Sequence, residues 1–308
     1  MSTKTAPQKG VFFCLYGPSK AGKTVASAAA GSTGVFIGDP SGLLSARTFL
    51  GIEKLNIMPG RLVPDITSAI EKITGSAKKI PSIVVDDFSL IVETTINEYE
   101  KTKGRSGMWS ALTRDVLAAR DAARIATDQG IIVIFNCHEQ PPRTSSGKFI
   151  RGGPSLPGQL PEKFSGMVDV IGRAMYEPTA SPWRYQLCFE PQPDYVSGDR
   201  LSVFPGKSPM NIAEGLRAAG FSVPYPKGLE WVDAQAGKIS TEILSQGIEN
   251  WGKVLEIFVA QLKADGKETP HIRWALQDGL HRATIKHHQD IDALRMFTSS
   301  GDDENLFA

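Results

Sequence analysis

The chain has few cysteines, almost no net charge and no long apolar run. Its three cysteines, Cys14, Cys137 and Cys188, each stand alone inside an apolar stretch. Disulfide frameworks and zinc sites use paired spacings, so we expect reduced core thiols instead. The N-terminus lacks an apolar signal core, and no uninterrupted apolar stretch approaches the length that spans a bilayer. We therefore expect a soluble, cytoplasmic protein without a membrane partner.

The composition is that of an ordinary globular protein. Among 308 residues, 41% are hydrophobic and 22% are charged, which is enough to bury a sizeable core. The formal net charge is only +1, so the chain has no global basic field. Any nucleic-acid binding must therefore come from a local basic patch or from oligomerisation.

One segment matches the phosphate-binding pattern GxxxxGK[ST]. It follows an apolar run typical of a buried strand and precedes an alanine-rich stretch typical of a helix, which disfavours a glycine-rich turn that binds nothing. In such a turn backbone N–H groups wrap a phosphate, a lysine adds a mobile charge and a hydroxyl binds magnesium. We predict an ATP site with Lys23 as a catalytic residue and Thr24 as a magnesium ligand. The predicted nucleotide-binding residues are Gly17, Pro18, Ser19, Lys20, Ala21, Gly22, Lys23, Thr24 and Val25.

Acidic and polar side chains follow two further apolar strands. The first strand ends in Asp86 and Asp87, and the second, 131–136, is followed by His138 and Glu139. A magnesium triphosphate site needs a carboxylate at the end of a neighbouring strand, so we assign Asp86 to the metal. We predict catalytic roles for Asp87, which would orient the attacking water, and for His138 and Glu139, which would sense the γ-phosphate. Solvated aspartates and a satisfied histidine at strand ends are the plainer alternatives.

Strands and helices alternate over the first two thirds of the chain. Continuous apolar strands in such an alternation indicate an α/β fold with a parallel central sheet covered on both faces. We predict strands at 11–16, 34–39, 80–87, 131–136, 167–176 and 183–190, and helices at 25–30, 65–73 and 110–128. From about residue 211 the pattern is mainly helical, with 241–264 and 271–297 as the longest candidates.

These patterns divide the chain into three parts. We predict a nucleotide-binding core over residues 1–227, a helical C-terminal region over 228–298 and a flexible acidic tail over 299–308. The tail places three acidic residues before an apolar tip. This tail resembles the acidic tips by which single-strand binding proteins recruit partners. A tail that only makes the protein more soluble is the alternative.

A long segment after the strand 131–136 is rich in proline, glycine, serine and basic residues. This segment, 140–163, is too irregular for a core element, and loops of such length are usually functional or disordered. Its basic residues Arg143, Lys148, Arg151 and Lys163, with Arg173 beyond it, are candidates for balancing the charge of a transition state, and solvated surface charge is the alternative for each.

Together these motifs resemble the RecA-type ATPases, and most closely the short phage-encoded RecA-like proteins grouped with single-strand annealing and recombination. The segments that carry the resemblance are 17–24, 83–87, 136–139, 152–158 and 203–209. The resemblance implies a RecA-like P-loop core, ATP and Mg²⁺ as cofactors, and a homo-oligomer with ATP between subunits. It also implies single-stranded DNA as a partner, with the segment 140–163 as the element that contacts DNA or senses ATP and Arg143, Lys148, Phe149 and Arg151 as its DNA-binding residues. A single-strand binding or other replication protein is a further implied partner, and the host cytoplasm is the implied location.

One departure from this family concerns hydrolysis. Such proteins commonly carry Asp-x-Glu-Gly after the strand that follows the P-loop helix, where this chain has Asp39-Pro40-Ser41-Gly42. The glutamate that poises water is missing, so hydrolysis is expected to be slow or to rely on Asp87 or Glu139.

Three functions stay open. The favoured one is a DNA-stimulated ATPase that binds single strands in phage recombination, annealing or replication. The second is a nucleotide-gated DNA-binding or assembly protein with little hydrolysis. The third is a helicase or packaging motor, which a P-loop alone does not distinguish, although the sequence has no second motor core and no full set of helicase motifs.

Overall fold

The computed structural model describes most of the chain up to residue 264. The described residues are 9–31, 34–38, 56–78, 80–145, 147–177, 184–202, 204, 207–209, 212–221, 223 and 227–264, with helical positions at 272, 275, 276, 279, 280 and 283. The chain divides into two compact units. The first comprises residues 1–47, 52–175 and 186–224, and the second comprises 48–51, 176–185 and 225–308.

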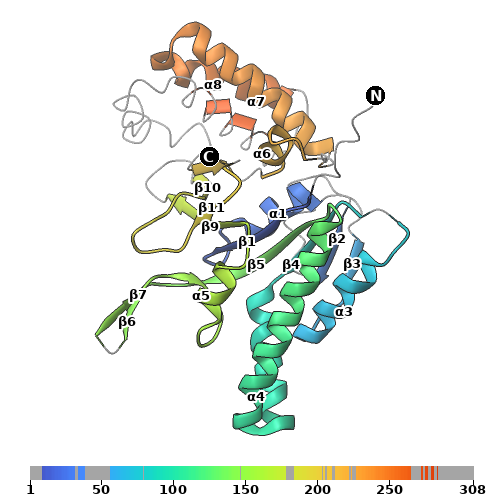
Figure 1. Cartoon of the computed structure of the whole chain (residues 1–308). Coiled ribbons are helices and arrows are strands. Elements are labelled where there is room, and N and C mark those ends of the chain that lie inside the picture. Colours follow the sequence, from blue (N-terminus) through green and yellow to red (C-terminus); the bar gives the residue numbers. More distant parts are fainter. Residues whose placement is uncertain are drawn as a thin grey trace, which may run out of the picture. The chain divides into compact units, whose positions relative to one another are not determined.

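A mainly parallel sheet is the centre of the fold (Figure 1). Its strands are β1 (Phe12–Gly17), β2 (Val35–Gly38), β3 (Asn56–Met58), β4 (Ser82–Asp86), β5 (Ile132–Gln140), β8 (Gly153–Pro154), β9 (Val170–Glu177), β10 (Arg184–Cys188), β11 (Gly198–Asp199) and β12 (Lys207–Pro209). The main order is β12-β10-β9-β1-β5-β4-β2-β3, and all pairs from β9 to β3 are parallel. The expected α/β core with a mainly parallel central sheet is confirmed, with β5 between the P-loop strand β1 and the acidic strand β4.

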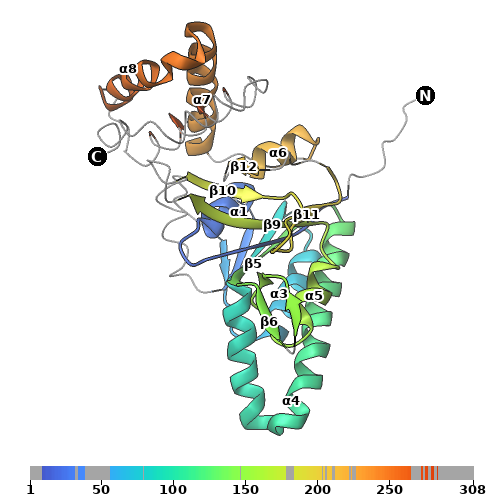
Figure 2. The same ribbon diagram turned by 90° about the vertical axis from the view of Figure 1, so that its left-hand side faces the viewer.

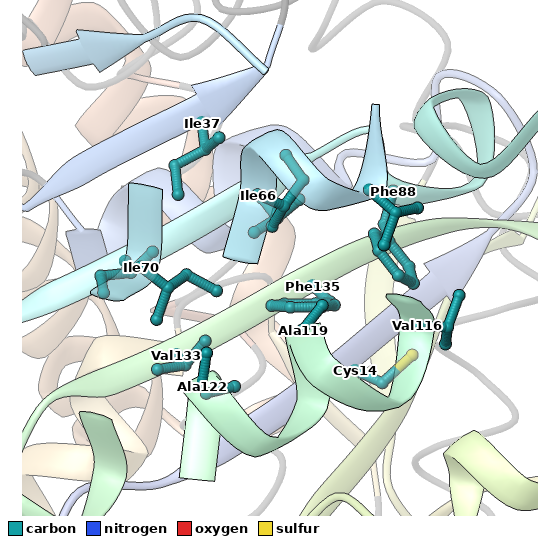
Figure 3. Close-up of a cluster of buried hydrophobic side chains, with 14 of the residues drawn as sticks. Cys14, Ile37, Ile66, Ile70, Phe88, Val116, Ala119, Ala122, Val133 and Phe135 are labelled. Atoms are coloured by element: carbon teal, nitrogen blue, oxygen red, sulfur yellow. The ribbon is translucent and has the colours of Figure 1, made fainter. Parts of the chain in front are cut away.

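Alternate side chains of the central strands point to opposite faces of the sheet. On one face Phe12, Cys14 and Tyr16 of β1 join a buried cluster with apolar residues of the covering helices. These helices are α3 (Val63–Thr74), α4 (Phe88–Asp128) and α5 (Leu160–Ser165). Figure 3 shows part of this cluster, with Ile70 of α3, Ala122 of α4 and Val133 of β5. The α1 helix (Lys23–Gly31) contacts β4 and β5 and also contacts α6 (Ile212–Ala218).

α4 is a helical hairpin instead of one straight helix. Its backbone breaks at Gly104, where φ is 66° and ψ is 167°. The arms 88–103 and 105–128 lie side by side, and their joined ends around the break project away from the sheet (Figure 2). Tyr99, in the small buried cluster between the arms, donates a 2.5 Å hydrogen bond from Oη to Asp115. The sequence predicts the second arm from residue 110 onward but not the first arm, because the polar tip interrupts the apolar spacing.

The segment 140–163 contains regular structure, so the prediction of an irregular loop was wrong. β5 continues to Gln140, and an antiparallel hairpin of β6 (Arg143–Ser145) and β7 (Lys148–Ile150) follows. All side chains of β6 and β7 are exposed. Strands without a buried face lack the apolar alternation that marks a strand in sequence. Figure 1 shows this hairpin projecting from the core.

The described residues of the second unit are mainly helical. α7 (Lys227–Gln246) is followed by a 3₁₀ turn (Ile248–Asn250) and by α8 (Trp251–Ala264). The prediction of one helix over 241–264 was wrong, because Gly247 has a φ of 87° and separates α7 from the next turn.

Several predicted features lie outside the described residues. These are the segment Asp39–Gly42, the acidic tail 299–308 and most of the predicted helix 271–297. Within the part of the chain that the structure describes, no helix is long and apolar enough to cross a membrane.

Candidate nucleotide-binding site

The P-loop lies between β1 and α1, where its sequence pattern places it. Gly17 lies so close to β9 that a Cβ there would come within 2.3 Å of the carbonyl oxygen of Ala174. Gly22 has a φ of 82°, a left-handed value that glycine adopts at little cost. The loop therefore reaches the N-terminus of α1, where free N–H groups and the helix dipole attract anions. Its other residues are Pro18, the exposed Ser19 and Lys20, and the buried Ala21, and Val25 follows inside α1.

Lys23 is buried within the loop to which it belongs. It is 7% exposed, and its Nζ donates hydrogen bonds to the carbonyl oxygens of Gly17 at 3.0 Å and Pro18 at 2.8 Å. Burial lowers the pKa of Lys23, and the charges of Asp87 and Asp86 partly oppose that shift. The two carbonyl partners are neutral, so a phosphate oxygen would bind the ammonium more strongly than they do.

Thr24 and Asp86 lie side by side at the start of α1 and the end of β4. Thr24 Oγ1 donates a 2.7 Å hydrogen bond to Asp86 Oδ2. Burial raises the pKa of Asp86, whereas the hydroxyl of Thr24 lowers it. A hydroxyl beside a carboxylate suits Mg²⁺, which takes few protein ligands and completes its shell with water and phosphate oxygens. Among the described residues no group of three or more His, Cys, Asp and Glu could hold a metal ion.

Asn136 and Ser27 support this site. Asn136 lies at the tip of the strand 131–136, where the sequence predicts a polar residue close to the γ-phosphate, whereas Ser27 is not among the predicted site residues. Ser27 Oγ lies 2.7 Å from Asn136 Oδ1, and both side chains are fully buried. Asn136 Nδ2 lacks a partner of good hydrogen-bond geometry, but the amide is near enough to Asp86 to lower the pKa of that carboxyl. We conclude that Ser27 orients Asn136 toward Asp86. The spacing of Ser27, one helical turn after Lys23, is the signal that could have identified it.

Asp87 starts α4 and binds His138. Its Oδ1 accepts hydrogen bonds from the backbone N–H groups of Ser89 at 2.8 Å and Leu90 at 3.4 Å, as an N-cap does. Its Oδ2 lies 2.9 Å from His138 Nε2. Burial raises the pKa of Asp87, and the charges of His138 and Lys23 oppose that shift. Both oxygens of Asp87 are thus engaged in holding α4 and His138 in place.

Glu139 forms an ion pair with Arg173 across the end of β1. Arg173 Nε donates to Glu139 Oε2 at 2.7 Å and Nη2 donates to Oε1 at 3.3 Å. Burial alone would lower the pKa of Arg173, but the hydrogen bond and charge of Glu139 outweigh it and raise the pKa. The guanidinium also lies 3.3 Å from the centre of the Tyr195 ring. Glu139 is therefore occupied, and Arg173 neutralises a carboxylate of its own subunit.

The residues predicted to contact DNA lie on and beside the β6–β7 hairpin. Arg143 pairs with Ile150 and Ser145 pairs with Lys148, so both cations share one face of the hairpin. Phe149 lies on the opposite face and is 51% exposed. Arg151 differs from the others because its Nη2 donates to the backbone carbonyl oxygens of Gln192 and Tyr195. It ties the base of the hairpin to a neighbouring loop.

Comparisons with known proteins identify the ATPase core. A family model described as an AAA domain matches residues 9–201. None of the curated proteins matches the chain. Among solved structures, the flagellar accessory protein FlaH from Methanocaldococcus jannaschii is 10% identical with a TM-score of 0.37, over 64% of this chain and 82% of that one. A KaiC-like protein from Pyrococcus horikoshii OT3 is 14% identical with a TM-score of 0.40, over 65% of this chain and 85% of that one.

Proposed function

We propose that this chain, which belongs to the AAA_24 family of AAA domains, is a DNA-stimulated ATPase that binds single-stranded DNA and supports recombination, annealing or replication. The family establishes a P-loop ATPase domain over residues 9–201. The proposal adds single-stranded DNA as the partner of this ATPase domain. The resemblance to phage-encoded RecA-like proteins supports recombination as the process.

The nucleotide part of the proposal rests on groups that surround one phosphate-binding loop. Lys23 and the N-terminus of α1 would bind the β- and γ-phosphates, and Thr24 with Asp86 would hold Mg²⁺. Bound magnesium would supply positive charge to the phosphate oxygens. Asn136 lies near enough to Asp86 to lower the pKa of that carboxyl, and the 2.9 Å contact of Asp87 Oδ2 with His138 Nε2 positions the side chain expected to lie near the γ-phosphate.

One observation carries the DNA part: β5 connects the nucleotide site to an exposed basic hairpin. Asn136 and His138 belong to the stretch of β5 beside the site, and β6 begins shortly after the end of that strand. The hairpin presents Arg143 and Lys148 on one face and the ring of Phe149 on the other. Cations bind phosphates and an exposed ring stacks on bases, which together favour a single strand. A movement of His138 on ATP binding would therefore be transmitted to the DNA-binding residues along one strand.

The test is binding of oligo(dT) with ADP, ATP or no nucleotide, measured by fluorescence anisotropy together with phosphate release. We expect ATP to tighten binding and oligo(dT) to accelerate release. A Lys23→Ala variant should lose both effects, and an Arg143→Ala/Lys148→Ala variant should lose DNA binding while it still binds ATP. Absence of oligo(dT) binding in every nucleotide state would refute the proposal.

A second candidate is a nucleotide-gated DNA-binding protein with little hydrolysis. The favouring observation is that the two carboxylates on which hydrolysis was expected to rely already have partners, Glu139 with Arg173 and Asp87 with His138. This candidate predicts ATP-dependent DNA binding without DNA-stimulated phosphate release, so the same experiment separates the two.

We also propose that the protein acts as a homo-oligomer with ATP between subunits. A charge supplied by the neighbouring subunit would then balance the transition state, since Arg173 is engaged within its own chain. Light scattering should show a larger species with ATP than with ADP. A monomer in both states would contradict this arrangement.

A further inference from the structure

The tip of the α4 hairpin is strongly basic. Lys101, Lys103 and Arg105 are exposed there, and residues 101–114 contain four basic residues and no acidic one. The nearest acidic residues in the sequence, Glu98 and Glu100 before it and Asp115 after it, lie on the arms. On a chain with a net charge of only +1, this is a local concentration of positive charge.

An exposed aromatic ring stands beside these cations. Trp109 is 45% exposed, although it lies in a helix and carries a large apolar side chain. It is one helical turn after Arg105, so both side chains lie on the same side of the second arm. Cations with an adjacent exposed ring match the chemistry of a single-stranded nucleic acid, which offers phosphates and unpaired bases.

Packed side chains between the two arms support the tip. Met108 and Ala111 are buried with Tyr99 between the arms, and the Tyr99 hydroxyl binds Asp115. Lys103 Nζ lies 4.9 Å from the centre of the Tyr99 ring. The first arm is about 24 Å long at 1.5 Å per residue, so the tip is held well beyond the sheet.

The tip and the β6–β7 hairpin leave the core at the same edge of the sheet. α4 starts directly after β4 and the hairpin follows β5, and these two strands are parallel neighbours. In Figure 1 the β6–β7 hairpin projects to the lower left of the core and the α4 hairpin projects downward. One strand of nucleic acid that leaves the β6–β7 hairpin can therefore continue toward the tip.

We propose that the α4 tip is a second binding site for single-stranded nucleic acid, in which Lys101, Lys103 and Arg105 bind phosphates and Trp109 stacks on a base. The inference rests on the proposed function, because it extends the strand bound at the β6–β7 hairpin. It predicts that short oligonucleotides occupy only the hairpin and that longer ones also occupy the tip.

The test compares oligo(dT) probes of increasing length on a Lys101→Ala/Lys103→Ala/Arg105→Ala variant. Each phosphate contact to a single strand contributes about 0.7 to the slope of log affinity against log salt, so the long-probe slope should fall by about 2. At about 0.1 M salt the long probe should bind about tenfold to hundredfold more weakly, and the short probe should bind as before. A matched variant at the opposite edge of the sheet, Lys9→Ala/Lys72→Ala/Lys78→Ala, should keep the wild-type slope.

Substitutions of Trp109 test the stacking separately. Trp109→Ala should weaken long-probe binding about tenfold with an unchanged salt slope, and Trp109→Phe should recover most of the loss because a phenyl ring still stacks. Circular dichroism and thermal unfolding check that the α4 hairpin is intact in each variant.

The outcomes are separable from those of the proposed function. If the wild type binds oligo(dT) and the tip variant keeps its long-probe affinity and slope, the tip inference is wrong and the proposed function stands. An equal loss in the matched variant would also overturn it, because the effect would then be one of total charge. If the wild type binds no oligo(dT) with any nucleotide, the proposed function fails and the tip inference fails with it.

Discussion

Removal of the Arg173 charge should destabilise the edge of the nucleotide site. The perturbation is Arg173→Met, which keeps an apolar stem against Tyr195 but leaves Glu139 without its partner. The two side chains are only 15% and 11% exposed, so the remaining carboxylate stays largely shielded from water. Such an orphaned charge costs more than the loss of a surface ion pair.

The magnitude follows from this burial. Breaking a buried pair on one side costs about 3 kcal/mol, and the lost contact of the guanidinium with Tyr195 adds about 1 kcal/mol. Glu139→Gln should cost about 1.5 kcal/mol, because the amide keeps an acceptor for Arg173 and removes the buried negative charge. The double variant leaves no unpaired charge, so the coupling free energy should be about 2 kcal/mol.

The assay is urea unfolding of the wild type, both single variants and the double variant at neutral pH. A coupling free energy below about 0.5 kcal/mol, the range of exposed pairs, would refute the assignment of Arg173 and Glu139 as a shielded pair. Phosphate release by Glu139→Gln, measured well below its unfolding temperature, addresses catalysis separately. A lasting loss of turnover would show that Glu139 acts on the reaction as well as on Arg173.

Three further predictions concern the site and the α4 hairpin. Burial raises the pKa of Asp86, so the folded state holds that proton more tightly and loses stability as the pH rises from 3.8 through the folded pKa. Asp86→Asn should therefore stabilise the nucleotide-free protein at pH 7 more than at pH 4 in thermal unfolding, and should abolish the extra stabilisation by Mg²⁺ with ATP. Asp87→Ala removes the N-cap of α4 and should lower the free energy of unfolding in urea by about 1 kcal/mol. Asp87→Asn should retain most of the cap, so equal losses in the two variants would contradict the capping role. Gly104→Ala should lower the free energy of unfolding by about 1 kcal/mol because of its positive φ alone, since nothing lies within 4 Å of the added Cβ. Gly107→Ala, inside the helix, should be neutral or stabilising. The reverse order of the two effects would contradict the break at Gly104.

Much of the fold could be predicted because its signals are local. The buried strands β1, β4 and β5 are continuous apolar runs, and the P-loop residues Gly17 to Thr24 form one uninterrupted pattern. The β6–β7 hairpin and the first arm of α4 were missed for the opposite reason. Their exposed or polar stretches contribute little to the core, so hydrophobic periodicity carries little information about them.

The sequence predicts where the residues of the candidate site lie, but not which side chains they bind. Asp86, Asp87, His138 and Glu139 lie at strand ends, as their places in the sequence indicate. The contacts between these side chains depend on the order of the strands in the sheet. β1 lies between β5 and β9, and no local sequence pattern predicts this order. The pairing of Glu139 with Arg173 across the end of β1 is a consequence of that order.

These pairings assign different tasks to the carboxylates beside the phosphate site. Asp86, next to Thr24, is the one positioned for a metal, while Asp87 caps α4 and Glu139 neutralises Arg173. A base that accepts a proton from water needs a free oxygen in the ionised state, and the partners of Asp87 and Glu139 occupy theirs. Fast hydrolysis would therefore require one of these pairs to open. The DNA binding proposed at the β6–β7 hairpin would act on the strand that carries His138 and Glu139, so it is the event best placed to open these pairs. On this reasoning, oligo(dT) should raise the rate of phosphate release, and Arg143→Ala/Lys148→Ala should leave only the slow, DNA-independent rate.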